Sequence, residues 1–136
     1  MNRVTDRKAS ANSGIERTCR LAEQQFRRVD MLEMLRHFYT ADARYITPDH
    51  KVLQGHDQIA AYIQNVSDEL GAVGLRLSTL DTRSCGADRG YVIGNGTFVL
   101  KDGAELESHY LCIFREEGGN WLCETEMAGL DRLELP

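Results

Sequence analysis

The 136-residue sequence predicts an α+β fold, with helices gathered on one face of a curved antiparallel sheet. Apolar residues recur at three- and four-residue spacing in the first half of the chain, which is typical of helices. From Arg89 to Gly129 they alternate with polar residues, which is typical of strands. The expected order is helix, helix, strand, helix and four long strands. A chain of this length forms one domain, expected over residues 13–136.

The helices follow from apolar spacing. Residues 1–12 are polar and basic without periodicity, so a mobile tail is expected there. A first helix is expected from Ser13, with its apolar stripe formed by Ile15, Cys19, Ala22, Phe26 and Val29. Asp30 is expected to cap a second helix that runs to about Tyr39. The segment 54–57 leads into a third, whose apolar face holds Ile59, Tyr62, Ile63 and Val66.

The strands follow from alternation and turn residues. Residues 43–47 form a short strand that Pro48 ends, and residues 75–84 form a long one. Asp102-Gly103 between alternating apolar residues predicts a hairpin with a two-residue turn. A four-residue loop at 116–119 then leads into the last strand; the alternative is a two-residue Gly118-Gly119 turn, which would shift the pairs but keep the faces.

These two turns set the pairing of the strands, and the pairing sorts the side chains into two faces. The inward face is expected to hold Tyr91, Ile93, Asn95, Thr97, Ser108, Tyr110, Cys112, Phe114, Trp121, Cys123, Thr125 and Met127. His109 and Glu126 fall on the outer face, where they form an exposed or interfacial pair. A bulge would exchange the faces, and it could turn these two residues into a His–carboxylate dyad inside.

Composition excludes several classes of function. A net charge of −5 gives no basic stripe for nucleic acid, and no apolar run is long enough to span a membrane. The polar N-terminus is unlike a signal peptide, so a cytoplasmic protein is expected. The four cysteines show no metal-type spacing. Cys112 and Cys123 are expected opposite each other, as buried thiols or, alternatively, as a cross-strand disulfide.

Four segments resemble the nuclear transport factor 2-like superfamily, in particular its SnoaL-like and ketosteroid-isomerase-like bacterial members. They are residues 38–43 before Pro48, residues 53–59, the hairpin at Asp102-Gly103, and Gly118-Gly119-Asn120-Trp121. The resemblance implies a cystatin-like, cone-shaped antiparallel sheet with three N-terminal helices on its concave face. It also implies a pocket that serves isomerisation, cyclisation, dehydration or epoxide opening in some members and ligand binding or association in others.

The resemblance also places family positions on this chain. The carboxylate base of ketosteroid-isomerase-like proteins corresponds to Thr47, and their protonated acid corresponds to Tyr110. Residues 18–25 lack the helix-one tyrosine, so steroid isomerisation by that mechanism is not expected. Tyr110 is inward by register as well, and a phenol in an apolar pocket can donate to a developing oxyanion. The alternative is a structural tyrosine whose hydroxyl is satisfied by Asn95.

The sequence therefore predicts a cofactor-independent isomerase, cyclase or dehydratase that acts on a hydrophobic oxygenated molecule. Its catalytic candidates are Tyr110, Tyr45 and His109, and no metal site is expected. The substrate-binding candidates are Thr47, Tyr62, Asn95, Trp121, Thr125 and Met127. A non-catalytic ligand-binding or association domain is the alternative, because no carboxylate or histidine is expected inside.

The outer face bears on assembly. Val92, Leu111, Ile113 and Leu122 are expected to form an apolar patch there, with Gly94 and Gly96 allowing close approach. This patch predicts a homodimer through the outer face of the sheet.

Overall fold

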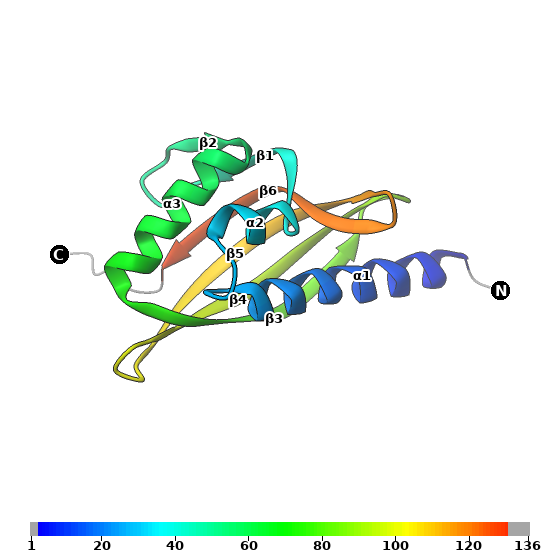
Figure 1. Cartoon of the computed structure of the whole chain (residues 1–136). Helices are drawn as coiled ribbons and strands as arrows, with labels where there is room; N and C mark the ends of the chain where they lie inside the picture. Colours follow the sequence, from blue (N-terminus) through cyan, green and yellow to red (C-terminus); the bar gives the residue numbers. More distant parts are fainter. Residues whose placement is uncertain (1–2, 131–136) are drawn as a thin grey trace.

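The computed structural model describes residues 3–130, and the side chains within residues 11–129. This part of the chain contains three helices and six strands (Figure 1). They are α1 (Arg3–Gln25), α2 (Met31–Arg36), β1 (Tyr39–Ile46), β2 (Val52–Gln54), α3 (Gly55–Leu70), β3 (Ala72–Ser84), β4 (Arg89–Leu100), β5 (Glu105–Glu117) and β6 (Asn120–Leu130). The α+β class and the order of the long elements are as predicted, and the short strand β2 is an addition.

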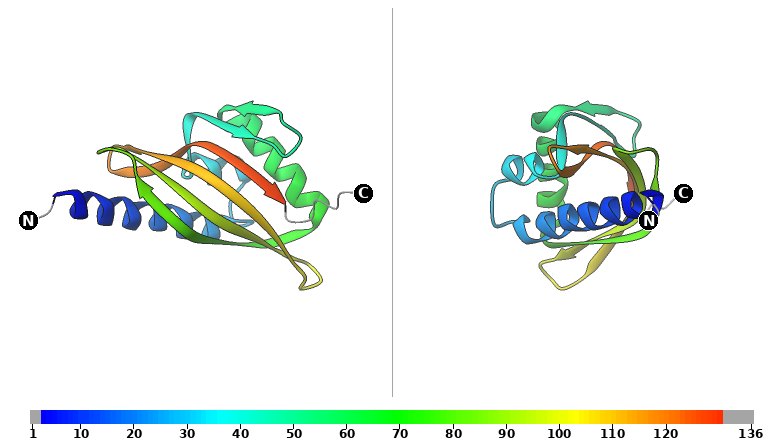
Figure 2. Two further views of the ribbon diagram at one scale, coloured as in Figure 1. Left: turned by 180° about the vertical axis from the view of Figure 1, so that it is seen from behind. Right: turned by 90° about the vertical axis from the view of Figure 1, so that its right-hand side faces the viewer.

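The strands form one sheet in the order β2-β1-β6-β5-β4-β3. Neighbours are antiparallel except for β1 and β6, which run parallel. The sheet curls around the three helices, which lie on its concave side (Figure 2). Strands β1 and β6 therefore lie side by side inside the sheet, which brings distant parts of the sequence together.

The predicted apolar stripe of α1 is its buried face. Ile15, Cys19, Ala22 and Phe26 are each at most 4% exposed. The helix begins at Arg3, within the stretch expected to be a tail, and it ends at Gln25. Val29 lies beyond that end and is exposed. Within residues 3–130, no helix has the length and apolar character needed to cross a bilayer.

The ends of the two shorter helices have local causes. Asp30 caps α2 as predicted, since its Oδ1 accepts the Glu33 backbone N–H at 2.8 Å. Helix α3 ends at Leu70 because Gly71 caps it, with a φ of 68°, the left-handed conformation that glycine adopts without steric cost.

Side chains of α1, and that of Arg27 just after it, cover part of the sheet edge at β3. Glu23 accepts the Leu77 backbone N–H at 2.6 Å, and Arg20 donates to the Leu77 carbonyl. Arg27 donates to the Ala72 carbonyl at 2.9 Å. Unpaired edge groups invite association with other strands, so these contacts protect the edge and fix α1 across the concave face.

The β4–β5 hairpin differs from the prediction by one residue. Leu100 pairs with Ala104, which leaves a three-residue loop that ends at Gly103 with a φ of 86°. The predicted two-residue turn is therefore wrong, and the β4 side chains expected to point inward point outward instead. Gly94 and Val92 are buried, whereas Ile93 is 44% exposed and Asn95 lies opposite His109.

Strand β6 contains the bulge that could exchange its faces. Phe114 pairs with Cys123 and Ile113 with Thr125, so Glu124 is an extra residue.

Glu117 pairs with Asn120, so the connection is the two-residue turn Gly118-Gly119 and the expected four-residue loop is wrong. The faces before the bulge are unchanged by this, and Trp121 and Cys123 are buried as predicted.

Beyond the bulge the faces are exchanged. Glu126 is buried, whereas Thr125 is only partly buried and Met127 is 52% exposed. The expectation that Thr125 and Met127 face inward is therefore wrong.

The convex face carries apolar side chains in contact with solvent, namely Ile93, Leu111, Ile113 and Met127. Val92, expected among them, is instead fully buried. Nothing in the structure shows what covers this face, so the homodimer expected through it stays a prediction.

The Gly94→Ala variant tests the facing of β4. A Cβ atom at this position would lie 2.5 Å from the Tyr110 hydroxyl and 2.6 Å from the Ser78 carbonyl. We expect the free energy of unfolding to fall by about 1–3 kcal/mol or more, because the site is overpacked. Urea unfolding measures this change. Gly129→Ala is the control, since its Cβ would meet no atom within 4 Å; equal stability of the two variants would contradict the register.

Candidate functional site

A cavity of about 110 Å³ lies between the concave face of the sheet and the three helices. The helices contribute to it only apolar side chains and Tyr62. The sheet contributes the polar groups, from Tyr39, Tyr45, Ser108, Tyr110, Cys112 and Glu126. This volume is smaller than the roughly 150 Å³ of a cavity that holds benzene, so the cavity limits a ligand to the size of one small ring at most.

Glu126 is the charged residue of this wall, and it is 8% exposed. Burial raises the pKa of its carboxyl from 4.5 to about 7, because the charged form loses its hydration. Hydrogen bonds from Tyr39 and Cys112 offset part of that shift, since they favour the carboxylate. Glu126 can therefore give or take a proton near neutral pH, which is the property a general acid–base requires.

Tyr39 holds the Glu126 carboxyl in place. Its hydroxyl donates to Glu126 Oε1 at 2.5 Å, and His56 Nε2 donates to the Tyr39 carbonyl at 2.9 Å. Burial, and then the neighbouring Glu126, raise the pKa of the Tyr39 hydroxyl well above its ordinary value. Tyr39 thus remains a neutral hydrogen-bond donor.

Two buried thiols surround the same carboxyl. The ligand atoms of Cys112, Cys123 and Glu126 lie within 4.8 Å of one another, close enough to share a metal ion. Metal binding requires thiolates, however, and burial raises the pKa of both thiols. A hydrogen-bonded group fits better: Cys112 donates to Glu126, and Cys123 donates to the Thr125 carbonyl at 3.4 Å. Both cysteines are free, and they are diagonal neighbours, not directly opposite as predicted.

Three of the predicted tyrosines line the cavity. Tyr45 is the β1 partner of Glu126, and its ring lies 5.5 Å from that of Tyr62. Burial raises the pKa of Tyr45, so its hydroxyl is a neutral donor. Tyr110 contributes its ring, while its hydroxyl is buried against Gly94 without a hydrogen-bond partner among the described residues.

The other predicted site residues lie away from this wall. Asn95 and His109 are on the convex face, where their side chains approach to 2.6 Å. Thr47 is buried, and its hydroxyl donates to Asp49. Trp121 packs on Gly14 of α1 and does not line the cavity. Thr125 and Met127 are turned outward by the bulge.

Sequence reasoning did not assign the two residues that form the centre of this site. Glu126 was expected outside, although the possibility of a bulge was a signal for it. Tyr39 carries no local signal, because its partner becomes a neighbour only through the parallel pairing of β1 and β6. His109 does not form the anticipated dyad with Glu126, since the bulge reverses β6 alone.

Comparisons with solved structures agree on the fold. A nuclear transport factor 2-like protein of unknown function from Shewanella oneidensis matches with a TM-score of 0.72 at 13% identity, over 86% of this chain and 97% of that one. A ketosteroid isomerase-like protein from Erwinia carotovora matches with a TM-score of 0.67 at 20% identity, over 88% and 95%. The chain has the nuclear transport factor 2-like fold.

A cystatin-like domain of unknown function from Nostoc punctiforme is similar to the same degree. It matches with a TM-score of 0.70 at 19% identity, over 86% of this chain and 75% of that one. No family model and no curated protein matches the sequence. At these identities the nuclear transport factor 2-like fold is shared, and the chemistry has to be argued from the site itself.

The Tyr39→Phe variant tests the hydrogen bond at the centre of the site. We expect the pKa of Glu126 to rise above 7 by roughly one unit or more, because a hydrogen bond to a charged group contributes about 1.5–3 kcal/mol. Carboxyl NMR titration measures the pKa. Tyr91→Phe, on the convex face, is the control; an unchanged Glu126 pKa in Tyr39→Phe would exclude the bond.

The Glu126→Gln variant tests the burial of the carboxyl through stability. The folded-state pKa of about 7 exceeds the unfolded value near 4.5, so wild-type stability is full below pH 4.5 and falls as pH rises through 7. Between pH 4.5 and pH 8, the free energy of unfolding of the wild type should fall by about 3 kcal/mol relative to that of the variant. Urea unfolding at both pH values measures the difference. A constant difference between the two proteins would contradict a buried, titrating Glu126.

Proposed function

We propose that this protein is a cofactor-independent enzyme that moves a proton on a small, apolar, oxygenated ring molecule, in a reaction of isomerase, cyclase or lyase type. The observation that carries this proposal is the Glu126 carboxyl, buried in an apolar cavity with a pKa near 7 and oriented by Tyr39. Perturbed carboxyl groups in clefts are characteristic of acid–base sites.

The proposed reaction begins with the ionised form of Glu126. Its carboxylate removes a proton from a carbon next to a substrate carbonyl, and the electron pair of that C–H bond moves onto the carbonyl oxygen. Glu126 is then a neutral acid. In an isomerisation, the carbonyl re-forms and Glu126 returns the proton to another carbon of the conjugated system. In a dehydration, the carbonyl re-forms, the C–O bond to the β-hydroxyl breaks, and Glu126 gives its proton to that oxygen, which leaves as water.

Charge that develops on the carbonyl oxygen needs a donor. Tyr45 lies beside Glu126 in the sheet and faces the cavity, and its hydroxyl makes no hydrogen bond with another described residue. A neutral phenol in a water-poor cavity can stabilise an oxyanion. Tyr110 also lines the cavity, and its role as a donor stays a prediction, because its hydroxyl lies against Gly94.

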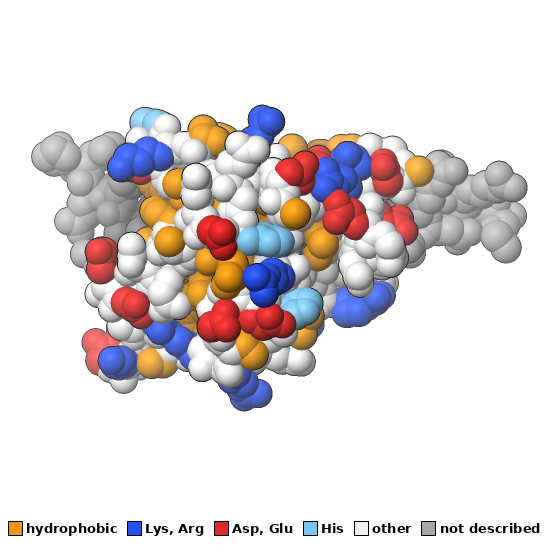
Figure 3. Space-filling view, turned by 45° about the horizontal axis from the view of Figure 1, so that its top comes forward, with side chains coloured by type: hydrophobic (Ala, Val, Ile, Leu, Met, Phe, Trp, Pro, Cys, Tyr) orange, Lys and Arg blue, Asp and Glu red, His pale blue; other side chains and the backbone are white. Residues whose placement is uncertain are grey.

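A neutral ligand fits the surroundings of this cavity. Figure 3 shows the face above α3 and β2, where acidic and basic side chains are mixed without a broad patch of one sign. Such a surface does not steer strongly charged ligands. The apolar helix side chains around the cavity favour a ligand with few polar atoms.

Hydrogen exchange in heavy water tests the proposal without knowledge of the natural substrate. We expect the protein to accelerate deuterium incorporation next to the carbonyl of small cyclic ketones and diketones, followed by proton NMR. The rate should rise as pH increases through about 7, because the carboxylate is the active form. Glu126→Gln should lower the rate by about 10²–10⁴-fold.

Glu107→Gln is the matched control, because it removes an exposed carboxylate from the convex face. It should leave the exchange rate unchanged. A ligand that binds in the cavity and is recovered without exchange, in wild type as in Glu126→Gln, would contradict an enzyme and favour the alternative of a binding domain.

A further inference from the structure

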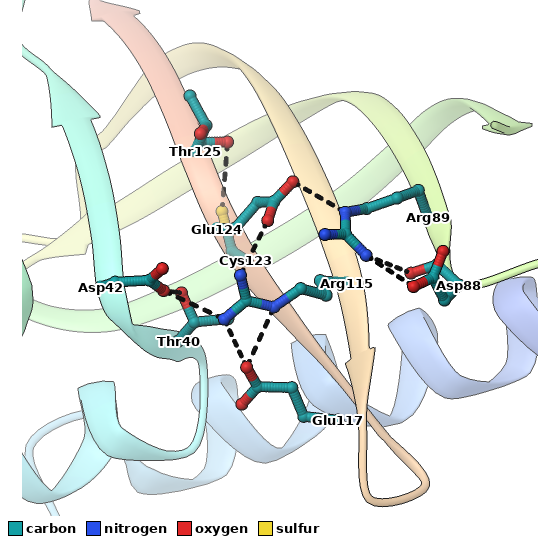
Figure 4. Close-up of polar contacts among 9 residues, drawn as sticks. All are labelled: Thr40, Asp42, Asp88, Arg89, Arg115, Glu117, Cys123, Glu124 and Thr125. Carbon is teal, nitrogen blue, oxygen red and sulfur yellow. Dashed lines mark hydrogen bonds and ion pairs between the residues drawn. The ribbon is translucent and has the colours of Figure 1, made fainter. Parts of the chain in front are cut away.

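A network of ion pairs crosses the convex side of the sheet directly behind the site (Figure 4). Arg115 of β5 is its centre, and its guanidinium donates to Asp42 of β1 at 3.0 Å and to Glu124 of β6 at 3.1 Å. It also donates to Glu117. Arg89 of β4 donates to the second oxygen of Glu124 at 3.0 Å. The network therefore joins four neighbouring strands.

Both acidic partners lie in irregular stretches of backbone. Glu124 is the extra residue of the β6 bulge, and Asp42 lies where the pairing of β1 with β6 shifts between Tyr39 and Arg44. A Thr40 hydroxyl also donates to Asp42, at 2.8 Å. The hydroxyl, and then Arg115, lower the pKa of Asp42, so this carboxylate keeps its charge.

The two site residues flank these irregular stretches. Tyr39 directly precedes the shift in β1, and Glu126 follows the bulge in β6. Because strand side chains alternate, the position of each irregularity decides whether the next side chains point inward or outward. A contact that fixes both irregularities also fixes the Tyr39–Glu126 pair on the opposite side of the sheet.

The charges make the arrangement of Glu124 specific. Arg89 and Arg115 are direct partners across β4 and β5, and like charges in that position repel each other. Glu124 gives one carboxylate oxygen to each of them, so it is the counterion that this pair of arginines requires. Arg115 and Glu124 are both less than a quarter exposed, so solvent screens their pairing less than that of an ordinary surface pair.

We propose that Arg115 is a positioning residue for the site: by binding Asp42 and Glu124 on the convex face, it holds the irregular stretches of β1 and β6 that direct Tyr39 and Glu126 into the cavity. Its importance for activity rests on the proposed function of Glu126. The structural role of Arg115 is independent of that function, and it can be measured without substrate.

The test is a carboxyl NMR titration of Glu126 in Arg115→Ala, with the resonance assigned by its loss in Glu126→Gln. We expect the Glu126 pKa to fall from about 7 by roughly one unit or more, because a released β6 lets water reach the carboxyl. Removal of a positive charge alone would raise the pKa. The direction of the change therefore separates positioning from simple electrostatics.

Arg76→Ala is the matched control. Arg76 of β3 binds Glu105 of β5 at 2.8 and 2.9 Å, across the intervening strand β4 and away from the bulge. Its loss should leave the Glu126 pKa unchanged. A Glu126 that still titrates near 7 in Arg115→Ala would overturn the proposal.

A deletion of Glu124 gives a second, independent measurement. Without the extra residue, a regular strand already places Thr125 opposite Ile113 and Glu126 opposite Cys112, as in the wild type. Arg115→Ala combined with this deletion should therefore fold and return the Glu126 pKa to near 7, even if Arg115→Ala alone does not fold. A double variant that fails to restore the pKa would also overturn the proposal.

This titration is independent of turnover. If Glu126→Gln keeps the full exchange rate while Arg115→Ala lowers the Glu126 pKa, then the proposed function fails and the positioning role stands. The reverse pattern would mean that Glu126 is catalytic but that other contacts hold it in place.

Discussion

The burial of the Glu126 carboxyl depends on one extra residue in β6, since strand side chains alternate and a bulge exchanges the two faces. The regular register would continue the inward positions of Trp121 and Cys123 through Thr125 and Met127. That arrangement would bury Met127, which is now 52% exposed, and leave Glu126 in water. The hydrophobic effect alone therefore favours the register that the chain does not adopt.

Contacts on both sides of the sheet offset the free-energy cost of burying Glu126 and exposing Met127. Inside, Tyr39 and Cys112 donate hydrogen bonds to Glu126, and the Cys123 thiol satisfies the Thr125 carbonyl beside the bulge. Outside, Arg89 and Arg115 share Glu124. Places where local pattern and observed structure disagree tend to be functional, because stability there is exchanged for another property. Here that property is a carboxyl with a pKa near neutrality.

Most of the fold was predictable because its signals are local. Helical spacing identified the buried stripe of α1, the Asp30 cap was readable directly, and the bounds of β4 agree with the prediction. The site was less predictable because register depends on single residues. Lys101 adds a third residue to the loop and Glu124 adds one to β6, and either change reverses a face. The partnership of Tyr39 with Glu126 had no local signal, since it joins residues 87 positions apart.

The separation of charge between the two sides of the sheet has a chemical consequence. The arginines lie on the convex side, whereas the groups around Glu126 are phenols and thiols whose raised pKa values keep them neutral. A cation inside the cavity would favour the carboxylate and lower the pKa of Glu126 towards its ordinary range. Neutral donors orient the carboxyl and leave desolvation as the largest cause of its shift. The same arrangement that fixes Glu126 from outside thus keeps it able to exchange a proton inside.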